Sequence, residues 1–201
     1  FSTQNRAVTQ EDYKILSYSM PTKFGSIKRA AVKRDPNSFK RNLNLYILSE
    51  DVNGNFILAN SVIKENLKNW LNSIRMINDA INILDAKIVN LAINFTAVAA
   101  LGVNKFEVLT SATEALQAFY SRKLEIGEPF YISDVYSQLN KLNGIVDVTR
   151  VNITHKSGEN YSSTAFDVNE MTSDDGMYIN APDNVVFEVK FPSIDIKGTI
   201  K

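Results

Sequence analysis

The sequence contains no cysteine and only one histidine among its 201 residues. The absence of cysteine excludes disulfides, thiolate metal sites and cysteine nucleophiles. A single histidine excludes every catalytic or metal-binding scheme that needs two. No stretch approaches the roughly 20 continuous apolar residues that cross a bilayer, so the sequence predicts no membrane insertion. Glycine is scarce, at eight residues, and neither of the glycine-rich phosphate-binding patterns occurs.

The charges balance overall but are unevenly distributed along the chain. Lys and Arg total 22, as do Asp and Glu, so the net charge is zero and we expect no nucleic-acid partner. Residues 23–41 are nevertheless basic, and residues 159–195 are acidic. Such segments can pair within one chain or with a second copy of it. We therefore predict an interface that includes Lys28, Arg29, Lys33, Arg34, Asp174 and Asp175.

The residues that could carry chemistry are better explained by structural roles. His155 follows a predicted strand, and no G-x-S-x-G element accompanies it. Ser61 and Lys64 form an S-x-x-K, but its partner motifs are missing, so Ser61 is interpreted as a helix start. The Asp174–Gly176 segment lacks the alternating acidic ligands of a calcium loop. The sequence thus predicts no catalytic, cofactor-binding or metal-binding residue, no cofactor and no enzyme activity.

The hydrophobic pattern predicts interspersed helices and strands over residues 1–155. Helices are expected from Thr9, over 61–75, from Asn104 to Leu124, and from Ser133 to the Asn143-Gly144 stop; strands are expected over 24–34, 43–49, 87–99 and 145–153. The long helix is predicted to bury a stripe that includes Phe106, Leu116 and Tyr120. This order favours an α+β domain, with a mixed sheet and helices packed mainly on one face.

Residues 156–201 differ in composition and are predicted to form a β-rich C-terminal arm or small lobe. Their first part is rich in Gly, Ser, Asn and Asp. Val185, Phe187, Val189 and Phe191 then alternate with other residues, as in a strand, and 193–200 is expected to be its partner strand. The expected domains are therefore 1–155 and 156–201.

The segment from Asn5 to Tyr13, NRAVTQEDY, resembles the R-A-V-T-x-x-D-Y signature of the baseplate J-like proteins of contractile phage tails and related injection machines. More narrowly, the chain resembles the C-terminal part of the baseplate wedge protein of T4-like myophages. The resemblance extends to about residue 155, through the strand entry at 24–30, the link at 75–79 and the turn at 143–148. The link departs from the family pattern, because Asn78-Asp79 stand where the family usually has glycine.

The resemblance implies a non-enzymatic structural protein of the virion, located in the tail baseplate and assembled in the host cytoplasm. Its implied partners are further copies of itself, as a homo-oligomer with a dimer within a ring, and other baseplate wedge proteins. The family signature normally lies in the middle of a longer chain, and the first residue here is Phe1, so we expect a fragment. The alternative is a cytosolic α+β module that binds a small ligand or peptide.

Overall fold

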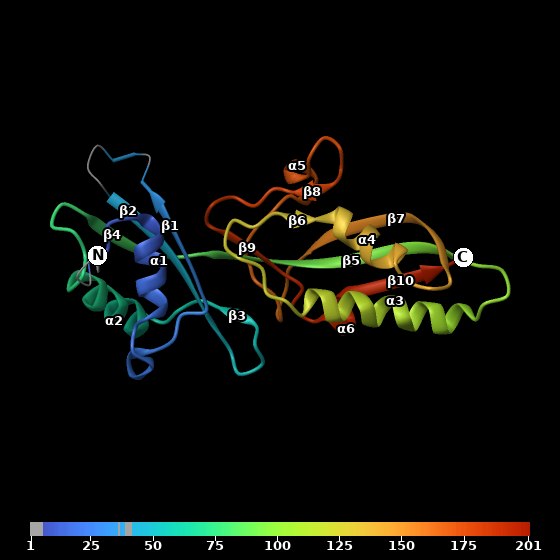
Figure 1. Ribbon diagram of the computed structural model, residues 1–201, viewed down its shortest axis with the longest axis horizontal. Coiled ribbons are helices and arrows are strands. Elements are labelled where there is room, and N and C mark those ends of the chain that lie inside the picture. Colours follow the sequence, from blue (N-terminus) through green and yellow to red (C-terminus); the bar gives the residue numbers. More distant parts are fainter. Residues whose placement is uncertain (1–5, 36, 39–41) are drawn as a thin grey trace, which may run out of the picture. The chain divides into compact units, whose positions relative to one another are not determined.

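A computed structural model describes residues 6–35, 37–38 and 42–201 of the chain (Figure 1). The described residues mix helices with parallel and antiparallel strands, which confirms the α+β class. Two compact units are present: unit 1 is Phe1–Lys87 with Asp183–Val185, and unit 2 is Ile88–Pro182 with Val186–Lys201. This division differs from the expected boundary after residue 155, because the C-terminal residues supply strands to the sheet of unit 2.

Unit 1 is a small mixed sheet with two helices. Its elements are α1 (Gln10–Tyr18), the 3-10 turn η1 (Thr22–Phe24), β1 (Arg29–Arg34), β2 (Asn42–Glu50), β3 (Phe56–Ile57), α2 (Ser61–Asn72) and β4 (Ala80–Asp85). Strand β2 is central, with β1 antiparallel on one side and β4 parallel on the other, and its last residues pair with β3.

The core of unit 1 lies between one face of this sheet and the two helices. Alternate residues of β1 and β2 point into it, because side chains along a strand alternate between its faces. They pack against Tyr13 of α1 and against Leu67 and Leu71 of α2. The Trp70 indole N–H donates a 2.9 Å hydrogen bond to the Leu16 carbonyl, which joins α2 to α1. The opposite face keeps polar side chains, including Asn44 and Asn82.

Unit 2 is built around the longest strand of the described chain. Its elements are β5 (Lys87–Ala99), α3 (Lys105–Tyr120), β6 (Phe130–Tyr131), α4 (Ile132–Asn140), β7 (Ile145–Lys156), α5 (Val168–Met171), β8 (Tyr178–Ile179), β9 (Val185–Glu188), α6 (Pro192–Asp195) and β10 (Ile196–Ile200). Strand β7 is antiparallel to β5, β10 is parallel to it, and β9 also pairs with it. Strands β6 and β8 form a separate short pair.

Helices cover one face of the unit 2 sheet. The other face is partly polar, as the alternation in β5 predicted, although Ile88, Asn90 and Ala92 on that side are buried as well. Helix α3 packs on β10 and α4 packs on β7. The covered face buries Leu91, Ile93 and Phe95. On the other face, neighbouring strands place Lys197, Asn94 and Asn152 in one row and Thr199, Thr96 and Arg150 in the next.

Several features of the fold differ from the expectations. Strand β4 was not predicted. The expected partner strand at 193–200 becomes β10, which pairs with β5, and β9 is buried at every position rather than alternately. The buried stripe of α3 is Val108, Ala112, Leu116 and Tyr120, while Phe106 is 82% exposed, because the helix presents a neighbouring face to the sheet.

Candidate functional site

The signature residues 6–13 form a helix start that is anchored to a distant turn. Thr9 caps α1: its hydroxyl accepts from the Asp12 N–H at 3.1 Å, and the Asp12 carboxylate accepts in return from the Thr9 N–H at 2.8 Å. The carboxylate also accepts from the Val8 N–H, at 3.0 Å. These backbone donors stabilise the charged form and lower the pKa of Asp12. Upstream, the Ala7 N–H donates to the Ile74 carbonyl at 2.9 Å. Asn5 of the resemblance lies outside the described residues.

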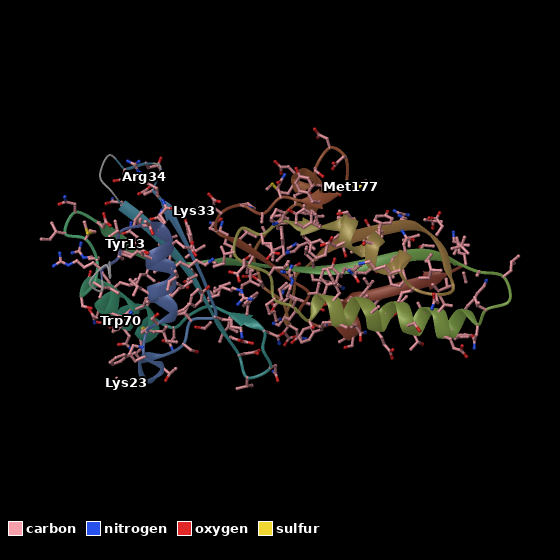
Figure 2. All side chains as sticks on the ribbon, in the orientation of Figure 1. Tyr13, Lys23, Lys33, Arg34, Trp70 and Met177 are labelled. Carbon is pink, nitrogen blue, oxygen red and sulfur yellow. The ribbon has the colours of Figure 1, made fainter. Side chains whose placement is uncertain are left out.

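The anchor is the pair formed by Tyr13 and Asp79, both 1% exposed. The Tyr13 hydroxyl donates to the Asp79 carboxylate at 2.7 Å and accepts from the Met76 N–H at 3.2 Å. The Arg75 guanidinium donates to the Asp79 carbonyl oxygen. Trp70 and Tyr13 both belong to this helix-covered side of unit 1 (Figure 2). The signature thus joins α1 to the 75–79 link, which is a structural role within unit 1.

The basic residues of the predicted interface largely have partners within unit 1. Lys28 forms an ion pair with Glu50, and Lys33 forms one with Asp183 at 2.7 Å. Arg29 donates to the Lys28 carbonyl at 2.9 Å, and its guanidinium lies 5.7 Å from the centre of the Phe56 ring. Arg34 is exposed and follows Lys33 at the end of β1 (Figure 2). Lys40 and Arg41 of the basic segment lie outside the described residues.

The acidic members of the predicted interface lie in a turn of unit 2. The Asp175 carboxylate accepts from the Ser173 hydroxyl at 2.5 Å and from the Met177 N–H at 3.0 Å. These donors, the hydroxyl first, lower the pKa of Asp175. Gly176 completes the turn with a φ of 69°, which favours glycine. Asp174 is exposed. The acidic segment therefore supplies one ion pair to unit 1, through Asp183, while Asp175 holds its own turn.

A buried polar network in unit 2 was not predicted. Glu188, whose side chain is 1% exposed, accepts from Lys123 at 2.6 Å and from the Asn90 side-chain amide at 3.1 Å. The Asn90 carbonyl oxygen in turn accepts from the Ser162 N–H at 2.7 Å. Each polar contact satisfies a group that would be costly to bury alone. The network joins β5, β9, the segment after α3 and the segment before α5.

The three residues considered for catalysis, Ser61, Lys64 and His155, lie at a helix start, in an ion pair and beside an open groove. Helix α2 begins at Ser61, as predicted, and the preceding Asn60 caps it by accepting from the Ile63 N–H at 2.8 Å. Lys64 forms an ion pair with Asp85 at 2.5 Å. His155 lines an open groove of about 580 Å³ beside Asp167. The Asp167 carboxylate caps α5 by accepting from the Asn169 and Glu170 N–H groups through one of its oxygens.

Two further hollows lie elsewhere in the described residues. A cavity of about 10 Å³ beside Tyr120 and Phe130 has room for a single water molecule. Burial there raises the pKa of the Tyr120 phenol well above its usual value. An open groove of about 650 Å³ lies between α2 and β4. Within the described ranges, no three His, Asp or Glu side chains lie close enough to hold a metal ion, and no helix has the length and apolar character to span a membrane.

Comparison with known proteins gives a structural likeness but no sequence match. No family model matches the chain, and no curated protein matches it. Among solved structures, the chain is similar to a protein of the baseplate of the anti-feeding prophage, determined by cryo-electron microscopy with six-fold symmetry. The TM-score is 0.55 at 12% identity, over 93% of this chain and 38% of that one. The chain therefore spans less than half the length of that protein, and the likeness establishes a shared fold.

Proposed function

We propose that the chain is a structural component of a contractile-tail baseplate and acts through protein–protein assembly. The observation that carries the proposal is the likeness of fold to a baseplate protein over 93% of this chain. The resemblance of residues 6–13 to the baseplate J-like signature supports it independently, because that resemblance lies in the sequence and not in the fold. The narrower assignment, to the wedge protein that forms a ring in T4-like myophages, rests on the sequence resemblance alone.

The geometry of the signature fits a structural part better than a reactive one. Thr9 and Asp12 satisfy each other's backbone groups, and Tyr13 is committed to Asp79 inside the core. A baseplate subunit must keep its shape under load, and such long-range tethers make the fold of unit 1 more rigid. The proposed partners are other baseplate proteins and further copies of this chain.

The proposed contact residues on the charged segments differ in whether they already have a partner within the chain. Lys28, Lys33 and Asp175 already have partners within the chain, so forming a new contact would require breaking an existing one. Arg34 and Asp174 are exposed, and we expect them to contribute more to binding another subunit. As charges at the rim of an interface, they would set orientation and association rate more than affinity.

The proposal is tested on intact particles. An antibody raised against the chain, detected with gold particles in electron micrographs of contractile tails from the source of the sequence, should label the baseplate end. Deleting the coding sequence should give tails without a complete baseplate. Label confined to other structures, or normal tails after deletion, would overturn the proposal.

A further inference from the structure

The outer edge of β4 is an unprotected strand edge. Strand β4 pairs with β2 in unbroken register from Ala80 to Asp85, and no other strand of the described residues pairs with it. Natural proteins shield such edges with lysine, proline or bulges. The strand sequence, AINILD, contains no lysine and no proline, and its register has no bulge. The edge is therefore a ready site for an additional strand.

The direction of the backbone groups shows which residues are available. The Ala86 N–H donates to the Ile47 carbonyl of β2 at 3.2 Å. Backbone groups of successive residues alternate in direction along a strand, so those of Asn82 and Leu84 also face β2. The N–H and C=O groups of Ile81 and Ile83 then face outward, where an added strand would meet them.

Beside this edge lies the open groove of about 650 Å³ between α2 and β4. Ile81 and Ile83 form its apolar floor, on the core side of the sheet. Its α2 wall carries Lys64, Glu65 and Lys68, with Lys64 held by Asp85. An added strand would place alternate side chains in this groove, and apolar ones would fit its floor.

We infer that the occupant is β4 of a second copy of this chain, paired antiparallel about Asn82. The strand reads almost the same in both directions about this residue, as Ala-Ile-Asn-Ile-Leu. Antiparallel pairing centred there sets Ile81 opposite Ile83 of the other copy, and Ala80 opposite Leu84. This is the self-complementarity that a two-fold interface requires.

The pairing also matches the hydrogen-bonding geometry. The outward N–H and C=O groups of Ile81 and Ile83 would form the hydrogen-bonded pairs on either side of the axis. The two Asn82 residues would form the non-hydrogen-bonded pair between them, where Cα atoms approach to about 4.5 Å. Asn82 already donates from its side-chain amide to Asn44 at 3.2 Å, so the row of amides would continue across the axis. As a biological contact this inference rests on the proposed function, since it names one way in which copies would join in an assembly.

The absence of cysteine makes a direct test possible. An Asn82→Cys variant would carry the only thiol, at a site where the two Cα atoms lie within the range that a disulfide spans. Mild oxidation of the full chain should give a covalent dimer. The matched control is Asn44→Cys, one strand inward in the same row, which should remain monomeric under the same conditions.

A second pair of variants tests the association without a covalent bond. Asn82→Lys would place two ammonium groups opposite each other and should abolish the dimer in sedimentation or light-scattering measurements. Asn44→Lys adds the same charge and loses the same amide contact, so it should leave the dimer intact. Circular dichroism confirms that both variants fold.

A parent chain that stays monomeric at high concentration, or an Asn82→Cys variant that cross-links no faster than its control, would overturn the inference. So would equal weakening by the two lysine variants. None of these results would change the outcome of the particle-labelling test, which addresses the proposed function. Conversely, a dimer together with unlabelled baseplates would overturn the proposed function and not the pairing.

Discussion

The phenol of Tyr13 donates a 2.7 Å hydrogen bond to the carboxylate of Asp79, 66 residues further along the chain. Both residues are 1% exposed, and the same phenol oxygen accepts from the Met76 N–H. One hydroxyl therefore holds the first helix to the link that leads into β4. The sequence signature ends on Tyr13. Its last two residues therefore have separate roles: Asp12 caps α1, and Tyr13 joins α1 to Asp79.

We expect Tyr13→Phe to destabilise the protein by about 1–3 kcal/mol, because it removes two hydrogen bonds from buried groups without opening a cavity. The measurement is the free energy of unfolding in urea. Tyr18→Phe, on the same helix, is the control: the Tyr18 hydroxyl accepts from the Ala30 N–H, but the side chain is 42% exposed and the variant leaves no buried carboxylate without its donor, so a smaller loss is expected. Equal effects of the two variants would contradict the role given to Tyr13.

The ion pair of Lys123 and Glu188 should be worth more than that of Lys64 and Asp85, although their N–O distances are 2.6 and 2.5 Å. The Glu188 side chain is 1% exposed, whereas those of Lys64 and Asp85 are 29% and 35% exposed. Removing one member of a buried pair leaves the other without compensation. We expect Glu188→Ala to cost about 3–5 kcal/mol, and Lys64→Ala at most about 1 kcal/mol.

Urea unfolding of the two variants measures this difference. A double-mutant cycle with Lys123→Ala separates the pair from the packing that Glu188 also loses, and a coupling of about 1–3 kcal/mol is expected. A coupling near zero would mean that the network around Asn90 stabilises Glu188 without Lys123.

Local signals predicted the elements with strong periodicity or clear caps. Strand β5 was predicted over 87–99 and spans those residues, because Asn90, Asn94 and Thr96 alternate with apolar residues in its central part. Helix α1 begins at the predicted Thr9 cap. Strand β4 was missed because its six residues follow a polar link and carry only two core-facing isoleucines, too short a pattern to separate from a loop.

Pairing between distant segments could not be predicted in the same way. Strand β10 joins β5 from the far end of the chain, and Asn90 meets Glu188 across 98 residues. Nothing local to Asn90 distinguishes it from Asn94, which stays partly exposed on the same face of β5. The charged segments were recognised from composition, but the partners of Lys28 and Lys33 depend on where the fold places Glu50 and Asp183.

Gly198 is the position where β10 can approach both β5 and α3. A Cβ atom there would lie 2.8 Å from Leu109 Cδ1 and would overlap the Phe95 ring. We expect Gly198→Ala to destabilise unit 2 by about 1–3 kcal/mol through overpacking. Thr199→Ala, at the exposed neighbouring position, is the control and should change the melting temperature little. Adding Phe95→Leu to Gly198→Ala should recover part of the loss, and the absence of any recovery would contradict the proposed clash.

The capping carboxylate of Asp12 should make the stability of the first helix depend on pH. Its pKa is lowered from the ordinary value of 3.8, mainly by the N–H groups of Thr9 and Val8. A carboxyl whose pKa is lower in the folded state stabilises that state above its unfolded pKa, and loses this contribution as the pH falls through the folded value. Asp12→Asn should therefore be less stable than the parent chain at neutral pH, and the difference should shrink below about pH 4. Glu11→Gln, which removes a neighbouring charge, is the control. Thermal unfolding from neutral to acidic pH measures both, and a stability difference for Asp12→Asn that is the same at every pH would show that the charge of Asp12 does not contribute to the cap.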